Sequence, residues 1–203
     1  MSDRPALVTV HAWPQDAARA LADLRSPPAW TVIRIATPDT PLRQAARGQS
    51  RSAVRELLSA FGGRPAASID LISEPGQALQ VAWTGPRVGL SLSHAAGISV
   101  AAIRVGGAIG VDIMRLAWAD GLPDWAAVAR DYLGPQAYGR IAKLPPAQRL
   151  CAFTREWTRL EAGLKCLGQA LTEWTSALEL RLAACRRNAL CLPASYCGTL
   201  AVT

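Results

Sequence analysis

The sequence has no uninterrupted apolar run long enough to cross a membrane. Its best candidate, residues 97–111, contains Arg104, whereas a membrane-spanning helix needs about 18 consecutive apolar residues. The N-terminal stretch reaches His11 and Pro14 after only a short apolar segment, which is a poor secretory signal. We therefore predict a cytoplasmic protein with no membrane partner.

Histidine and paired cysteines are also scarce. The two histidines are His11 and His94, and no G-x-S-x-G motif is present, so a Ser-His-Asp triad is not expected. The 5 cysteines include no C-x-x-C pair, which argues against a zinc site, and their odd number argues against a full set of disulfides. The sequence predicts reduced, mostly buried thiols.

The composition predicts a folded and basic protein. The chain has 203 residues, enough for one large domain or two small ones, and 50% of them are hydrophobic. Lys and Arg total 22 against 15 acidic residues, which gives a net charge of +7. Such a charge attracts nucleic acid, an anionic membrane, a nucleotide-like cofactor or an acidic protein, and charge alone does not choose among them.

Hydrophobic periodicity and turn residues predict a mixed α+β fold with a seam near Gly110. Short apolar runs separated by Gly and Pro turns over 68–114 predict a meandering antiparallel sheet. The Arg-Arg-Asn segment 186–188 is predicted as a turn. Helices are expected over 14–24, 41–61, 124–133, 135–143 and 146–167, and the other strands over 7–13, 30–36, 176–182, 189–192 and 196–202.

Arginines recur every fourth residue along the predicted helix 41–61. Four residues advance about 40° beyond one full turn of a helix, so Arg43, Arg47, Arg51 and Arg55 form a slanted basic stripe. The stripe is either a solvated face or a surface that contacts an anion.

One acidic side chain falls in an apolar strand. Alternation places Asp112 and Met114 on one face of that strand and Val111 and Ile113 on the other. An ionised carboxylate there is costly unless a cation or several donors meet it. Asp112 is therefore either a salt-bridging residue or part of a functional site.

Two further groups of residues carry possible chemistry. Glu161 and Lys165 lie at the edge of the apolar stripe of helix 146–167, either as a surface ion pair or as charges that face a cleft. Ser93 and His94 end a strand beside a turn of small residues, which either is structural or offers donors to a phosphate.

Taken in order, these motifs resemble those of the 4'-phosphopantetheinyl transferases, especially the surfactin-synthetase-activating (Sfp-like) subgroup. That family has a Ser-His turn, then a G-[IV]-D-[IL] strand, then a W-x-x-x-E-[AS]-x-x-K helix. Here they are Ser93-His94, Gly110-Val111-Asp112-Ile113, and Trp157 with Glu161-Ala162 and Lys165. The resemblance spans about residues 43–171. It implies a monomer with a pseudo-two-fold axis and two similar α+β halves, 1–109 and 110–203, each with a small antiparallel sheet packed on helices.

The resemblance implies a holo-[acyl-carrier-protein] synthase type of enzyme. It would transfer the phosphopantetheine arm of coenzyme A to a serine of an acyl or peptidyl carrier protein and release adenosine 3',5'-bisphosphate. The pathway would be fatty acid, polyketide or nonribosomal peptide biosynthesis. The general base implied by the resemblance would be Glu161 or a water bound to the metal ion. The implied residue roles are Mg²⁺ or Mn²⁺ binding for Asp112 and Glu161, assistance to the leaving phosphate for Lys165, and coenzyme binding for Lys165, Ser93, His94, Arg43, Arg47 and Arg51.

The sequence departs from the family pattern at two places. Met114 stands where many relatives have a second acid, so that a water would complete the metal coordination. Residues 168–171 read Gly-Gln-Ala-Leu where relatives often have Gly-Lys-Gly-Leu, which removes one basic contact.

Two other interpretations of the sequence stay open. One is a relative that binds coenzyme A or a carrier protein without turnover. The other is a basic nucleic-acid-binding module, which would leave Asp112 and Glu161 without a role; no nucleic-acid motif is found. The sequence does not indicate which carrier is modified.

Overall fold

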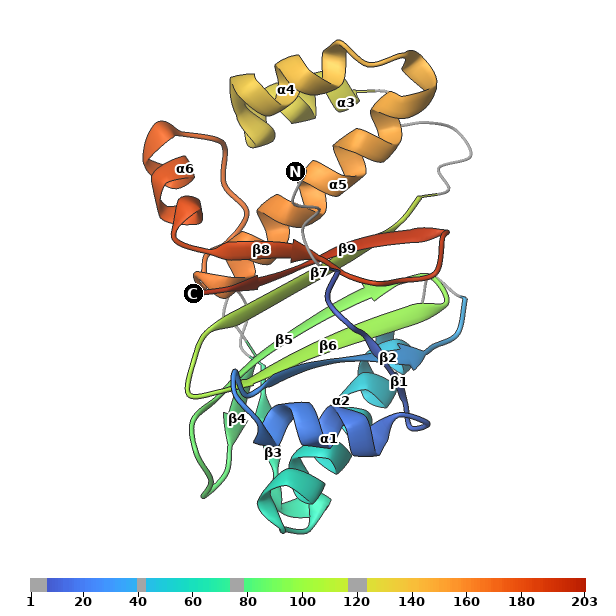
Figure 1. Ribbon diagram of the computed structural model, residues 1–203, viewed down its shortest axis with the longest axis vertical. Helices are drawn as coiled ribbons and strands as arrows, with labels where there is room; N and C mark the ends of the chain where they lie inside the picture. Colours follow the sequence, from blue (N-terminus) through green and yellow to red (C-terminus); the bar gives the residue numbers. More distant parts are fainter. Residues whose placement is uncertain (1–6, 40–42, 74–78, 117–123) are drawn as a thin grey trace.

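The computed structural model describes residues 7–39, 43–73, 79–116 and 124–203 (Figure 1). It has the mixed α+β architecture predicted from the sequence, with small sheets that pack against helices. In the part of the chain that is described, no helix combines the length and apolar character that crossing a membrane requires. The division into halves 1–109 and 110–203 remains a prediction.

The first sheet has the strand order β1-β2-β6-β5, and all of its pairs are antiparallel except β1 with β2. Two helices cover one face of this sheet through a core that includes Leu24, Ile33, Leu57 and Ile103 (Figure 1). The strands are β1 (His11–Trp13), β2 (Trp30–Ala36), β5 (Val88–Ala95) and β6 (Ile98–Val105), and the helices are α1 (Ala17–Arg25) and α2 (Arg43–Gly62).

The second sheet has the antiparallel order β7-β9-β8, and the long helix α5 packs on its outer face (Figure 1). Shorter helices surround α5. The bounds are β7 (Ile109–Arg115), β8 (Arg186–Ala189), β9 (Tyr196–Val202), α3 (Trp125–Val128), the π-helix η2 (Ala129–Leu133), α4 (Gly134–Ala142), α5 (Pro146–Cys166) and α6 (Ser176–Ala183).

The inner faces of the two sheets pack on each other. Val32, Val100 and Ala102 of the first sheet meet Val111 and Leu200 of the second in one buried cluster. Val111 and Ile113 therefore face the core between the sheets, as alternation along β7 predicted, and Asp112 faces α5.

The predicted meander over 68–114 is wrong in its connections. β3 (Asp70–Ile72) and β4 (Gln80–Ala82) form a separate two-stranded sheet, which follows the short 3-10 helix η1 (Ala66–Ser68). β7 leaves β6 and pairs with β9, because its apolar face is buried against the inner side of the first sheet. Sequence adjacency does not determine which sheet a strand joins.

The predicted strand 176–182 is also wrong, because this segment forms helix α6. The Thr175 hydroxyl caps the helix by accepting a hydrogen bond from the backbone N–H of Leu178 at 3.0 Å. Leu178 and Leu182, four residues apart, are buried against α5, whereas Leu180 is 75% exposed. Leu178, Leu180 and Leu182 alternate as in a strand, but only Leu178 and Leu182, which share one face of the helix, are buried.

Two further segments differ from the prediction. The predicted turn at 186–188 belongs to strand β8, which pairs with β9. The predicted strand over 7–13 is regular only in β1, and Val8 forms a separate parallel bridge to Leu190 near the second sheet. Strands β2 and β9 and helices α2 and α5 agree closely with the expected ranges.

Candidate functional site

Helix α5 lies unusually close to strand β7, and Gly110 makes this possible. A Cβ atom at Gly110 would lie 2.0 Å from the carbonyl oxygen of Ala162 and 2.5 Å from the backbone nitrogen of Cys166. Only glycine has room at this point of contact. Asp112 is two residues further along the strand, so it shares the face that α5 covers.

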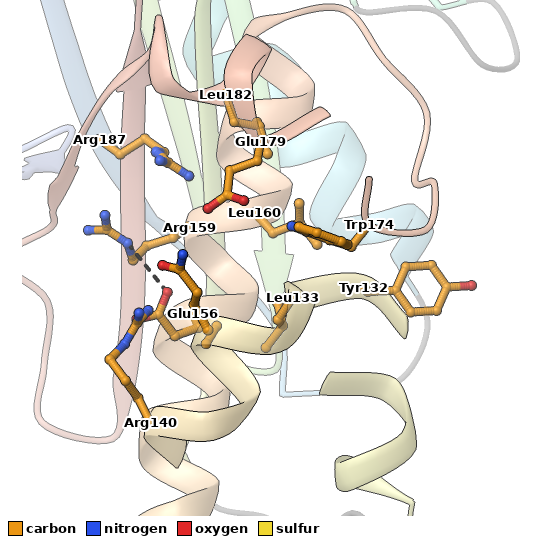
Figure 2. Close-up of a pocket in the computed structure, with 12 residues that line it drawn as sticks. Tyr132, Leu133, Arg140, Glu156, Arg159, Leu160, Trp174, Glu179, Leu182 and Arg187 are labelled. Carbon is orange, nitrogen blue, oxygen red and sulfur yellow. Dashed lines mark hydrogen bonds and ion pairs between the residues drawn. The ribbon is translucent and has the colours of Figure 1, made fainter. Parts of the chain in front are cut away.

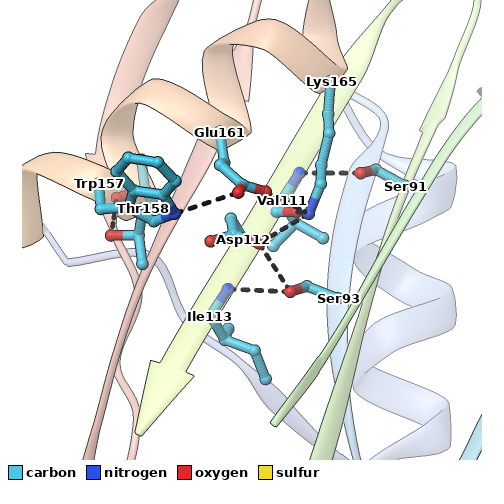
Figure 3. A network of polar contacts seen from close by, with 10 residues as sticks. Ser91, Ser93, Val111, Asp112, Ile113, Trp157, Thr158, Glu161 and Lys165 are labelled. Carbon is cyan, nitrogen blue, oxygen red and sulfur yellow. Dashed lines mark hydrogen bonds and ion pairs between the residues drawn. The ribbon is translucent and has the colours of Figure 1, made fainter. Parts of the chain in front are cut away.

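Asp112 is the buried centre of a polar network (Figure 3). Its residue surface is 5% exposed, and its Oδ1 accepts hydrogen bonds from Lys165 Nζ at 2.6 Å and from Ser93 Oγ at 2.8 Å. Burial raises the pKa of the Asp112 carboxyl above its usual value; the Lys165 ammonium opposes this increase and the charge of Glu161 adds to it. The network therefore favours a cation beside Asp112.

Glu161 is the second carboxylate of this network. Its Oε1 accepts a hydrogen bond from Trp157 Nε1 at 3.1 Å, and its Oε2 lies 3.7 Å from Lys165 Nζ. One ammonium nitrogen therefore contacts carboxylates from both β7 and α5. The two acids converge in space, as their interpretation as a shared cation site requires.

The network opens into a cavity of about 530 Å³. Asp112, Glu161 and Lys165 line it together with Ser93 and His94, so the carboxylates are not sealed from ligands. The thioether side chain of Met114 lines the same cavity.

A second cavity of about 450 Å³ adjoins the first and shares His94 and Lys165 with it. Arg47 and Arg51, from the predicted basic stripe on α2, line this second cavity. Arg55 instead donates to the carbonyl oxygen of Ile69 at 3.0 Å, which is a structural contact. The side chain of Arg43 lies outside the described residues.

Ser93 and His94 have different surroundings. Ser93 Oγ is buried; it donates to Asp112 and accepts a hydrogen bond from the backbone N–H of Ile113 at 3.1 Å. His94 Nδ1 lies 2.7 Å from Ser99 Oγ, and the residue lines both cavities. The hydroxyl of Ser93 is therefore occupied in orienting Asp112, whereas His94 is placed beside possible ligands.

The donor set fits a hard divalent cation. Within residues 7–39, 43–73, 79–116 and 124–203, no group of three or more His, Cys, Asp or Glu side chains is placed to share a metal ion. Zn²⁺ takes about four protein or water ligands and prefers nitrogen and sulfur, whereas Mg²⁺ accepts one or two carboxylates together with waters and phosphate oxygens. Asp112 and Glu161, already bridged by an ammonium, fit Mg²⁺ better than Zn²⁺.

One comparison bears on this geometry. Residues 108–195 match the sequence model of the 4'-phosphopantetheinyl transferase superfamily. The matched range contains Asp112, Glu161 and Lys165, and it supports a phosphopantetheinyl transferase activity in general terms. No curated protein gives a significant match to the chain. The resemblance to the surfactin-synthetase-activating subgroup remains a prediction.

Two features of the site were not recognised in the sequence. Trp157 is the first residue of the W-x-x-x-E pattern, and its indole N–H orients Glu161; their spacing of four residues is the available signal. The serine bridges between β5 and β7 had no sequence signal, because they join two edge strands of different sheets.

In the interpretation of Asp112 as a metal ligand, Ser93→Ala is expected to lower kcat by about 10- to 100-fold, the usual effect of removing a group that orients such a ligand. The matched control for kcat is Ser91→Ala; because Ser91 also lines the second cavity, the two variants are compared in kcat and not in KM. Ser91 Oγ also accepts a hydrogen bond from a β7 backbone N–H, that of Val111 at 3.0 Å, but it makes no described contact with Asp112. Both variants should lose similar stability in thermal denaturation, and equal activities of the two would contradict the positioning role of Ser93.

Proposed function

We propose that the protein is a Mg²⁺-dependent 4'-phosphopantetheinyl transferase. It would transfer the phosphopantetheine arm of coenzyme A to a serine of an acyl or peptidyl carrier protein and release adenosine 3',5'-bisphosphate. The observation that carries this proposal is the convergence of Asp112 and Glu161 on one ammonium, in a cavity that adjoins an arginine-lined one. The family match over residues 108–195 supports the same reaction class.

The two cavities suit the nucleotide phosphates and the diphosphate of coenzyme A. Arg47, Arg51 and His94 provide cationic and hydrogen-bonding groups for the phosphates of the nucleotide. Lys165 lies between the cavities, where it can contact the diphosphate. Asp112 and Glu161 would hold Mg²⁺, which when bound neutralises charge on the diphosphate.

The chain supplies no nucleophile in this proposal, because the attacking hydroxyl belongs to the carrier serine. Of the two carboxylates, Glu161 is the more accessible, with 29% of its side chain exposed against 7% for Asp112. We assign proton acceptance to Glu161 for this reason. Trp157 donates a hydrogen bond to one carboxylate oxygen of Glu161, and the other oxygen of Glu161 lies near Lys165. The net charge of +7 would attract an acidic carrier.

A carrier-loading assay tests the proposed function. Apo carrier domains from fatty acid, polyketide and peptide assembly lines are incubated with the protein, coenzyme A and Mg²⁺, and their intact masses are measured. We expect at least one carrier to gain the phosphopantetheine arm, and we expect a chelator to abolish the gain and added Mg²⁺ to restore it. Coenzyme A binding without a mass gain in any carrier would favour the non-catalytic relative.

We expect Arg47→Ala and Arg51→Ala each to raise the KM for coenzyme A by about 10- to 100-fold and to change kcat little. The reason is that a hydrogen bond between charged groups contributes about 1.5 to 3 kcal/mol to binding. Arg64→Ala, which removes an exposed arginine beyond the end of α2, is the control and should leave KM unchanged. Initial rates at varied coenzyme A concentration give both constants. An unchanged KM in both Arg47→Ala and Arg51→Ala would mean that coenzyme A does not bind in this cavity.

A further inference from the structure

A third cavity lies along α5 (Figure 2), and neither Asp112 nor its partners Ser93 and Lys165 line it. Arg159 and Glu161 are two residues apart on α5, so they project about 200° apart around the helix axis. The cavity has a volume of about 140 Å³ and is lined by residues of η2, α4, α5, α6 and β8 and by Trp174. It is separate from the two cavities assigned to coenzyme A.

Arginine outnumbers acid in this cavity. Arg140, Arg159 and Arg187 line it together with Glu156 and Glu179. Glu156 is shared, because Arg140 Nη2 lies 3.3 Å from its Oε1 and Arg159 Nε lies 3.7 Å from its Oε2.

Arg187 is the guanidinium whose charge is least compensated. In the part of the chain that the structure describes, its side chain makes no hydrogen bond and no close ion pair. Burial lowers the pKa of Arg187, and the positive charge of Arg159 lowers it further; Glu156 and Glu179 oppose this with weaker effects. A half-buried guanidinium that is destabilised by a second positive charge is costly unless an anion lies near it.

We propose that this cavity binds a small oxyanion, held between the guanidinium groups of Arg159 and Arg187 beside the indole of Trp174. Guanidinium groups bind carboxylate and phosphate oxygens in a planar, paired geometry. The volume admits a phosphate group or a short carboxylate but falls below the several hundred Å³ typical of pockets for larger ligands. The proposal does not depend on the transferase reaction.

Calorimetric titration of the full chain with inorganic phosphate, and separately with acetate, tests this proposal. The protein carries Arg47→Ala and Arg51→Ala, which weaken anion binding in the second cavity. We expect saturable binding of at least one anion, weakened by about 10- to 100-fold when Arg187→Gln is added, as the loss of a charged hydrogen bond predicts. Preference for phosphate would indicate a phosphate or phosphomonoester ligand, and preference for acetate a carboxylate.

Arg186→Gln is the matched control, since Arg186 is the exposed neighbour of Arg187 on β8 and does not line the cavity. It should leave anion binding unchanged. Without anion, Arg187→Gln should melt at or above the temperature of the parent, because it removes a half-buried charge that the charge of Arg159 repels. A loss of binding then does not reflect misfolding. Saturable binding of neither anion, or binding that Arg187→Gln does not weaken, would overturn the proposal.

Discussion

Asp112→Asn is expected to lower the rate of carrier loading on the order of 10³-fold. The asparagine retains the shape of the side chain and an oxygen that can accept from Ser93 and Lys165, but it removes the negative charge that would hold Mg²⁺. Loss of the several kcal/mol that a metal ion contributes to a phosphoryl transition state corresponds to a factor of this size. Single-turnover loading at saturating coenzyme A measures the effect.

The same substitution should not destabilise the protein at pH 7 when the metal is chelated. Because burial raises the pKa of Asp112, the folded state binds this proton more tightly than the unfolded state. Binding of this proton therefore stabilises the folded protein below the pKa of the Asp112 carboxyl in the unfolded chain, which is about 4. This stabilisation is lost as the pH rises through the pKa of the same carboxyl in the folded protein. Asparagine is neutral throughout, so the Tm of the variant should equal or exceed that of the parent at pH 7, and this advantage should decrease toward pH 4.

Asp70→Asn is the control for these measurements, since Asp70 is an exposed carboxylate on β3 that lines none of the described cavities. It should leave both loading and melting unchanged. If Asp112→Asn loads the carrier within threefold of the parent rate, Asp112 does not hold the ion. If it melts well below the parent at pH 7, the buried charge is favourable and our account of the network is wrong.

Much of the site was predictable from the sequence because its residues obey simple periodicities. Alternation along β7 separates Asp112 from the core-facing Val111 and Ile113, and the apolar stripe of α5 places Glu161 and Lys165 at its edge. Neither pattern indicates that the strand and the helix meet. That expectation came from the family resemblance, and the structure brings the three side chains together.

The errors in the predicted fold have a common physical cause. Leu178, Leu180 and Leu182 alternate as in a strand, but Leu180 faces solvent and the other two bury one face of a helix. Likewise, β7 follows β6 closely in the chain yet pairs with the distant β9. Local pattern limits which faces of an element can be buried, but tertiary packing decides which face meets which partner.

Gly110→Ala is expected to reduce both stability and activity, because the added Cβ would meet the backbone of α5. Its closest neighbours would be the carbonyl oxygen of Ala162 and the backbone nitrogen of Cys166, and neither can move without the helix. We expect a loss of about 3 kcal/mol, the upper part of the usual range for overpacking, and a Tm lower by about 6 to 12 °C for a chain of this size.

The activity of Gly110→Ala should fall even at temperatures where the variant is folded. Ala162 and Cys166 directly follow Glu161 and Lys165, so a helix displaced from β7 carries both charged side chains away from Asp112. The contact of Lys165 Nζ with the carbonyl oxygen of Val111, 3.2 Å in the structure, would lengthen as well. Loading assays well below the Tm, with circular dichroism to confirm folding, separate this effect from unfolding.

Gly139→Ala provides the matched control for Gly110→Ala. Gly139 lies inside helix α4, and a Cβ there would have no neighbour within 4 Å. Alanine is favoured over glycine in a helix by about 0.5 to 1 kcal/mol, so this variant should melt slightly higher with unchanged loading. A native Tm and a native loading rate for Gly110→Ala would mean that α5 does not pack directly on β7, and the convergence of Asp112, Glu161 and Lys165 would lose its structural basis.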